Sequence, residues 1–208
     1  MGVLGAIKAR WNIRKYKITL EAIKTRRSIR KYKSTPVGDK TIELVLEAAR
    51  WAPSWVNSQC WRFIAVRDSS IKDKLAGALI GVSDRPNRAT EAIRNAPVAI
   101  VACAELGKSG YSAREPRQPV TDKSEFWYMF DVALAMQNLV LAAHSLGLGT
   151  VYIGAFDAKK VATILGVPEG FCVVSMTPLG YPDEEPPIRP RKELSEIVFY
   201  DKFGSNNA

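Results

Sequence analysis

The feature that most constrains the fold is a long segment, from about Asp122 to Ser145, that is apolar on nearly every side of a helix. A helix of this kind is buried in a core or against another subunit. The sequence therefore predicts a central helix, covered by other elements or by a second copy of the chain, that ends at Gly147. One predicted stripe of this helix holds Phe130, Leu134, Gln137, Leu141 and His144.

Shorter elements alternate along the rest of the chain. Short apolar runs bounded by turn residues predict strands over residues 63–66, 98–103, 150–153 and 171–179. Helices are expected over residues 19–25, 70–79 and 158–165, after Pro36-Val37-Gly38, and just before Pro97, with N-caps at Asp39, Ser70 and Asp157. This order fits an α/β or an α+β domain. No strand is followed by G-x-G-x-x-G, and no P-loop is present, so a Rossmann nucleotide site is not expected.

The positive charge of the chain is concentrated at one end. Residues 1–33 hold eleven Lys and Arg against the single acid Glu21, whereas the whole chain carries +9, so the remainder is close to neutral. We expect a basic N-terminal extension over residues 1–18 and one domain over residues 19–208. Residues 1–12 fit a short amphipathic helix, either packed or solvated, or in contact with anionic lipid. A nucleic-acid binder carries its basic surface across the domain, so that function is not expected.

The cysteine and histidine content limits the possible sites. Cys60, Cys103 and Cys172 are odd in number and form no C-x-x-C pair, so neither a disulfide framework nor a zinc site is indicated. The lone His144 excludes any site that needs two histidines. No apolar run approaches the roughly 20 residues that cross a bilayer, and no signal peptide is visible. The expected location is the cytoplasm, and no metal site is predicted.

Two basic segments have the chemistry of a phosphate site. Arg26, Arg27, Ser28 and Arg30 combine guanidinium groups with a hydroxyl, which suits a phosphate monoester. Near the other end, Arg189 and Arg191 lie in an extended, proline-rich segment. The alternative is a solvated basic surface at a helix C-terminus. Cations crowded together without an anion would repel, so convergence of the two segments would itself indicate a ligand.

A polar loop and a strand end could bind a flat ring. The loop from Pro53 to Gln59 carries Ser54 and Asn57, and amide side chains offer both a donor and an acceptor to a ring edge. An ordinary turn is the alternative. Ile153-Gly154 follows a predicted strand, and the missing side chain at Gly154 would let a ring approach the backbone.

The chain resembles the FMN-dependent nitroreductase family in several successive motifs. These are RRSIRKY, PVGDKTIELVLEAARWAPSWVNSQCWRF, DVALAMQNLVLAAHSLGLGTVYIGAF, LGVPE and PLGYPDEEPP with a final basic pair, which together span about residues 20–200. The resemblance implies an α+β fold with a mixed, mostly antiparallel sheet wrapped by helices. It also implies an intertwined homodimer with two FMN sites at the interface.

The resemblance assigns the cofactor-binding residues by motif position. The phosphate end would be held by Arg26, Arg27, Ser28, Arg30, Arg189 and Arg191. The partner subunit would bring Pro53, Ser54, Trp55, Asn57 and Gln59 near the flavin, and the backbone of Ile153 and Gly154 would contact the ring. The family often has Pro where this chain has Cys60, which would loosen the loop, place a thiol near the site, or simply bury a small side chain. Contacts from residues 81–94 could not be aligned.

The function implied is an FMN oxidoreductase. Hydride would pass from NADH or NADPH through FMN to an electron-poor acceptor such as a nitroaromatic or a quinone, with ping-pong kinetics. No catalytic side chain is expected, because the cofactor carries the chemistry. The alternatives are an FMN-binding or storage protein with little turnover, a flavin-using dehalogenase-like enzyme of the same fold, or a basic-tailed protein that binds a membrane or nucleic acid.

Overall fold

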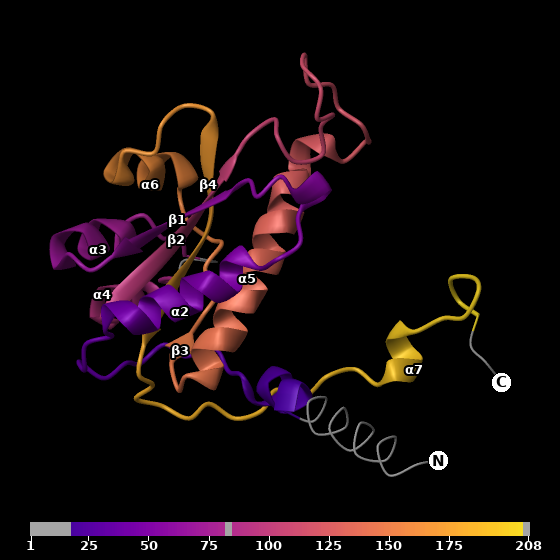
Figure 1. The fold of residues 1–208 in the computed structure, drawn as a ribbon. Coiled ribbons are helices and arrows are strands. Elements are labelled where there is room, and N and C mark those ends of the chain that lie inside the picture. The colour runs from indigo at the N-terminus through magenta and orange to yellow at the C-terminus, as the bar shows by residue number, and fades with distance from the viewer. Residues whose placement is uncertain (1–17, 82–84, 206–208) are drawn as a thin grey trace, which may run out of the picture.

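The core of the protein is a four-stranded sheet (Figure 1). The computed structural model describes residues 18–81 and 85–205. The strands are β1 (Trp61–Val66), β2 (Val98–Glu105), β3 (Gly149–Thr150) and β4 (Phe171–Gly180), in the spatial order β1-β2-β4-β3. Every pairing between these strands is antiparallel, and a single parallel bridge joins Ser28 to Thr150. The predicted α+β fold with a mixed, mostly antiparallel sheet is confirmed.

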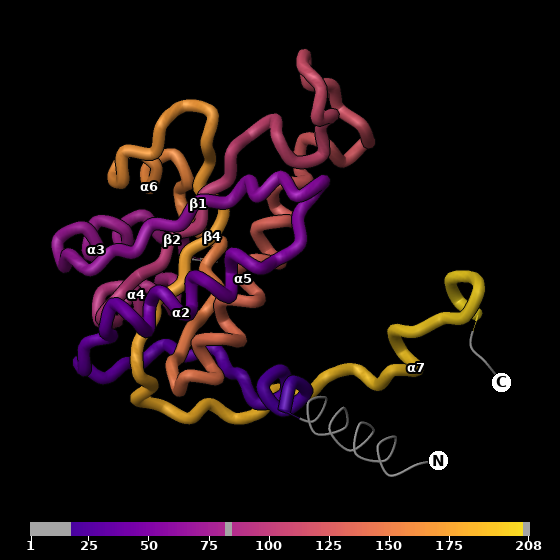
Figure 2. The backbone as a smooth tube through the Cα atoms, in the orientation of Figure 1, coloured from indigo at the N-terminus to yellow at the C-terminus, as the bar shows by residue number. Residues whose placement is uncertain are grey.

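Helices cover both faces of the sheet (Figures 1 and 2). On one face these are α2 (Asp39–Arg50) and α5 (Trp127–Ser145), and on the other α3 (Ser69–Ala76), α4 (Thr90–Asn95) and α6 (Ala158–Leu165). The chain also forms α7 (Leu194–Ile197) and a helix over residues 18–25. Successive residues of a strand face opposite sides of the sheet. Accordingly Ile100 and Ala102 of β2 pack with α2 and α5, whereas Val101 packs with α3, α4 and α6. Burial on both faces explains why β2 is one continuous apolar run.

Helix α5 is confirmed as the long core helix, but it is not buried on every side. It begins at Trp127, after a 3₁₀ turn over Ser124–Phe126, and its buried face includes Val132, Met136 and Leu139. The stripe predicted from Phe130 onward lies outside this face, and Phe130 is 59% exposed. Ser124–Ser145 also has the length and mean hydropathy, 1.3, of a membrane-spanning helix, contrary to the expectation for this chain. Its contacts with α2 and the sheet are those of a core helix.

The helix starts were predicted with mixed success. Asp157 caps α6 by accepting the backbone N–H of Lys160 at 3.0 Å, as expected. The cap of α3 is Asp68, which accepts the N–H of Ile71 at 2.9 Å, and not Ser70. Asp39 makes no cap, because it is the first residue of α2 and Gly38 holds the N-cap position. The carboxylate of Asp39 pairs with Arg67 instead. The residues expected to form an N-terminal amphipathic helix, 1–12, lie outside the described part of the chain.

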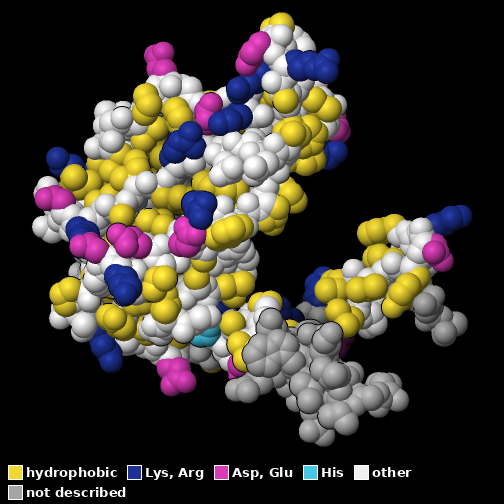
Figure 3. All heavy atoms as spheres, viewed as in Figure 1, with side chains coloured by type: hydrophobic (Ala, Val, Ile, Leu, Met, Phe, Trp, Pro, Cys, Tyr) yellow, Lys and Arg dark blue, Asp and Glu magenta, His cyan; other side chains and the backbone are white. Residues whose placement is uncertain are grey.

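The C-terminal segment leaves the body of the molecule. After β4 it passes beneath the sheet in extended form and then carries α7 away from the other helices (Figures 1 and 2). Apolar side chains are spread over this separate arm (Figure 3). Ile188, Leu194 and Phe203 are 76%, 73% and 94% exposed. The described part of a single chain therefore leaves these side chains largely uncovered.

Candidate functional site

A basic cavity of about 870 Å³ forms where the two ends of the domain meet. Its cations come from the helix at residues 18–25, from the segment that follows it, from the loop before α4 and from the C-terminal segment. Ser28, Glu184 and Glu185 also line it. The cations are Lys24, Arg26, Arg27, Arg30, Arg88, Arg189 and Arg191. The predicted convergence of the two basic segments is therefore present in the structure.

Backbone pairing brings these distant segments together. Ile29 donates its N–H to Thr150 O at 2.9 Å, and Lys33 donates to Tyr181 O at 2.9 Å. The first of these contacts needs a glycine in β3, because a Cβ on Gly149 would lie 2.8 Å from the Ile29 side chain. Glu184 fastens the other edge by accepting the N–H groups of Arg30 and of Lys31, the latter at 3.1 Å. The site is thus built by main-chain contacts between residues more than a hundred positions apart.

The guanidinium groups of the basic cavity lack carboxylate partners among the described residues. Arg27 donates to the carbonyls of Lys24 and Arg26, at 2.6 and 2.9 Å, and Arg191 donates to those of Arg189 and Pro190. Every ion pair found in the described part of the chain lies elsewhere, as with Arg50–Glu47 and Arg94–Asp73. Seven cations line the cavity against two carboxylates, and this excess of like charge favours binding of an anion. This cavity is therefore suited to a phosphate group.

A second cavity of about 660 Å³ adjoins the basic one and shares Arg30 and Arg88 with it. Residues Val151 to Ala155 form one wall, and residues Arg85 to Ala89 also line the cavity. A Cβ added to Gly154 would meet nothing within 4 Å, so the backbone is open there. Ile153 and Gly154 therefore line a cavity next to the basic one, and their contact with a flavin ring remains a prediction.

The loop before α4 supplies cavity residues that sequence reasoning missed. Arg85 and Arg88 line the second cavity, and Arg88 also reaches the basic one. Asn87 fixes this loop by donating to the carbonyls of Ile80 and Ala155, at 3.0 and 3.2 Å. No spacing or motif distinguishes Arg88 from the other surface arginines of the chain.

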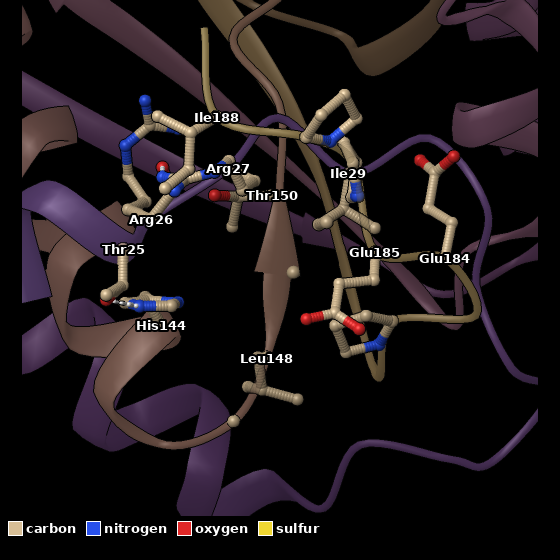
Figure 4. Close-up of a pocket in the computed structure, with 15 residues that line it drawn as sticks. Thr25, Arg26, Arg27, Ile29, His144, Leu148, Thr150, Glu184, Glu185 and Ile188 are labelled. Carbon is tan, nitrogen blue, oxygen red and sulfur yellow. Dashed lines mark hydrogen bonds between the residues drawn. The ribbon is translucent and has the colours of Figure 1, made fainter.

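The only histidine of the chain borders a third cavity, which shares Arg26 and Arg27 with the basic one. Figure 4 shows this cavity, of about 740 Å³, with the Thr25–His144 hydrogen bond at one side and Arg26 and Arg27 above it. Thr25 Oγ1 donates to Glu21 O at 2.7 Å, so His144 Nε2 is the donor to Thr25, also at 2.7 Å. Burial and the charges of the two arginines lower the pKa of His144. The imidazole is therefore neutral at pH 7 and reports on the charge of this cavity.

Within one chain, the polar loop lies apart from the basic cavity and from the second cavity that adjoins it. Its 3₁₀ turn, η1 (Trp55–Asn57), borders a separate hollow of about 320 Å³ together with Lys108, Tyr111 and Arg117. No residue from Pro53 to Gln59 lines the two cavities described above. Their placement next to the flavin of a partner subunit remains a prediction.

Cys60 is a buried thiol at the end of this loop. Burial and the charge of Asp131 raise the pKa of Cys60 to about 11. The thiol is therefore protonated at neutral pH and lies 4.0 Å from Asp131 Oδ2. A protonated, buried thiol is a poor nucleophile, which favours a packing role over a reactive one.

Comparison with known proteins identifies the family. The family model described as Nitroreductase family matches residues 23–181, so this chain belongs to the nitroreductase family. A Methanothermobacter thermautotrophicus protein whose name includes NADH dehydrogenase and NAD(P)H nitroreductase is 33% identical over 193 residues, covering 91% of this chain and 82% of the relative.

Solved structures agree with this assignment. A nitroreductase family protein from Clostridium novyi NT is 32% identical with a TM-score of 0.69, and the match covers 90% of this chain and 96% of the other. The NADPH:FMN oxidoreductase of Vibrio harveyi, solved with NAD⁺, is 28% identical with a TM-score of 0.75, and the match covers 91% and 79%.

Proposed function

We propose that this protein is an NAD(P)H-dependent FMN oxidoreductase that acts as a homodimer. The observation that carries the proposal is the basic cavity, where arginines from both ends of the domain converge without carboxylate partners in the described part of the chain, next to the open backbone at Gly154. A flavin mononucleotide has the matching shape, a flat ring at one end and a phosphate dianion at the other. The names of the related NAD(P)H nitroreductase and NADPH:FMN oxidoreductase support the same activity.

The residues present fit the cofactor and have distinct tasks. Arg26, Arg27, Ser28, Arg30, Arg189 and Arg191 would hold the phosphate, and Ile153 and Gly154 would face the ring. The chemistry that FMN supplies when bound is hydride acceptance from NAD(P)H and its delivery to an electron-poor acceptor. Arg88, which borders both cavities, would stabilise negative charge on the reduced ring.

The exposed apolar arm supports the homodimer. Leu194 and Phe203 are 73% and 94% exposed, and Phe130 on α5 is 59% exposed. Contiguous exposed apolar surface marks an interaction site. A second copy would cover both and bring its loop, Pro53 to Gln59, to the flavin. An enzyme that uses NAD(P)H is also expected in the cytoplasm.

The acceptor would bind over the same face of the ring after the oxidised nicotinamide leaves, which gives ping-pong kinetics. Nitroaromatics and quinones are the proposed acceptors, because stacking on the flavin ring requires only a flat, electron-poor molecule. The chain contributes orientation and electrostatics and needs no nucleophile. Loop 105–120 and Trp127 are candidates for the acceptor wall.

A visible absorption spectrum tests the proposal. The purified protein, loaded with FMN, should be yellow and should bleach when NADPH is added without oxygen, then regain its colour when p-benzoquinone is added. A yellow protein that does not bleach would favour the storage alternative. A protein that takes up no FMN would contradict both.

A further inference from the structure

The buried carboxylate of Asp131 joins two loops, residues 53–59 and the start of residues 105–120. Asp131 is the only acidic residue of α5 and is 1% exposed. Its Oδ2 accepts the Trp55 N–H at 3.0 Å, the Ser58 hydroxyl at 3.2 Å and, at a shorter distance, the Ser109 hydroxyl. A buried carboxylate is tolerated only when such donors compensate for its lost hydration. The donors come from both sides, the polar loop and the loop after β2.

The backbone of the polar loop, residues 53–59, adopts unfavourable φ angles that these contacts help to maintain. Val56, Asn57 and Gln59 have φ values of 45°, 55° and 46°, in the left-handed region that favours glycine. Such a conformation is unfavourable for an L-residue, and a β-branched residue such as Val56 is a marked exception there. This backbone persists only when its surroundings fix it. The Asp131 contacts at Trp55 and Ser58 bracket the strained turn.

The second loop is fixed by the same cluster. Trp55 Nε1 donates to Tyr111 O at 2.9 Å, next to the Ser109 hydroxyl that Asp131 accepts. Gly110 between them has a φ of +83°, and a Cβ there would lie 2.7 Å from Ser124. Ser109 to Tyr111 is therefore confined between the polar loop and the turn that precedes α5.

We infer that Asp131 is a positioning residue that sets the polar loop, residues 53–59, and the start of loop 105–120 in one mutual geometry. The hollow of about 320 Å³ between Asn57 and Arg117 takes its shape from this geometry. The inference rests on the proposed function in one respect. That function identifies the flavin edge and the acceptor as the groups that the two loops face. Asp131 touches neither and acts through the donors it holds.

The test compares Asp131→Asn with Asp157→Asn, the same change at an exposed helix cap. An amide oxygen accepts, but the amide nitrogen donates, so the substituted side chain cannot serve all the donors that converge on the carboxylate. In flavin-free protein, trypsin should cut after Lys108, Arg114 or Arg117 at least about fivefold faster in the Asp131 variant, because losing about 1 kcal/mol of local restraint raises the open population by that factor. The Asp157 variant should be cut like the wild type.

A second measurement uses the FMN-loaded protein well below its melting temperature. Asp131→Asn should shift the absorption bands of the bound flavin and raise KM for p-benzoquinone at least about fivefold. A Ser109→Ala variant, which keeps the carboxylate, should raise KM with a smaller spectral shift, and Ser145→Ala should match the wild type. A role in stability alone would lower the melting temperature and leave the spectrum and KM unchanged.

Separate outcomes overturn the two proposals. Wild-type protein that binds no FMN would contradict the proposed function. The trypsin experiment uses flavin-free protein, so it would still test whether Asp131 positions the two loops. Wild-type cleavage rates, spectrum and KM in Asp131→Asn would overturn the inference. If that variant does not fold, Ser58→Ala and Ser109→Ala take its place, and unchanged cleavage and KM in both would overturn it equally.

Discussion

The basic cavity and the Asp131 cluster, which is Asp131 with its donors Trp55, Ser58 and Ser109, differ in how their charges are compensated. In the basic cavity, several guanidinium groups stand half-exposed or exposed with backbone carbonyls as their partners. Around Asp131, one carboxylate is buried and receives donors from two loops. Under the proposed function the first site would be complete only with a bound anion, whereas the donors to Asp131 are already in place within a single chain. Charge balance thus separates a ligand site from a structural one more clearly than residue type does.

Removing cations should have the largest effect, because it acts on the incomplete site. A charge-assisted hydrogen bond contributes about 1.5 to 3 kcal/mol, so Arg26→Ala with Arg191→Ala should weaken FMN binding by about a hundredfold or more. Quenching of FMN fluorescence during titration measures the affinity. The matched control is Arg67→Ala with Arg94→Ala, whose side chains pair with carboxylates far from the cavity. An affinity within twofold of the wild type at moderate salt would mean that the phosphate sits elsewhere.

The next largest effect is expected in the C-terminal arm that carries α7. Its apolar side chains are exposed in a single chain, so they are also expected to gain a partner. Leu194→Asp with Ile197→Asp should shift the protein from dimer to monomer, because burying two new carboxylates at an interface is costly. Light scattering coupled to size-exclusion chromatography measures the mass. Glu193→Gln, a neighbouring change without an apolar contact, should remain dimeric. A wild-type protein that is already monomeric at micromolar concentration would refute the shared site.

A change inside the strained loop should affect chemistry more than folding. Asn57→Asp keeps a residue that tolerates a left-handed backbone, but it removes the amide donor. We expect about a tenfold lower kcat with p-benzoquinone and a melting temperature within a few degrees of the wild type. A variant whose melting temperature falls by many degrees, but whose bound flavin reacts at the normal rate below that temperature, would assign Asn57 to the turn alone.

The smallest effect should appear at His144. Its pKa lies below the ordinary value of about 6.5 because of burial and of Arg26 and Arg27. The folded state therefore binds this proton less readily than the unfolded state, and stability falls as the pH drops below about 6.5. A phosphate dianion would offset the arginine charges and raise the pKa. Since the chain has one histidine, its proton NMR signal is unambiguous, and an unchanged titration after FMN is added would contradict the placement of the phosphate.

The sequence was most informative where local periodicity and caps decide the structure. The apolar run of β2, the cap at Asp157 and the long α5 all follow from local pattern. Choices between equivalent neighbours failed, as when Asp68 rather than Ser70 capped α3, because both residue types cap well. The uncovered face of α5 could not be located, since its burial depends on which helices pack against it.

The candidate site was predicted in its chemistry but not in its assembly. The arginines were identifiable, yet their convergence depends on pairs such as Ile29 with Thr150, which no local pattern encodes. Arg88 carried no signal. Asp131 did carry a sequence signal, which was overlooked. It is the single acidic residue in a nineteen-residue helix that is mostly apolar. Buried acids are rare unless they are paired, so an isolated acid in such a segment indicates convergent donors.

Native mass spectrometry of the protein offered equal amounts of FMN and riboflavin tests the central claim most directly, because these ligands differ only in the phosphate. The account predicts a dimer carrying two FMN molecules and little riboflavin, since the arginines from both ends of the domain recognise the dianion. Equal uptake of the two ligands, or a monomer that carries neither, would contradict it.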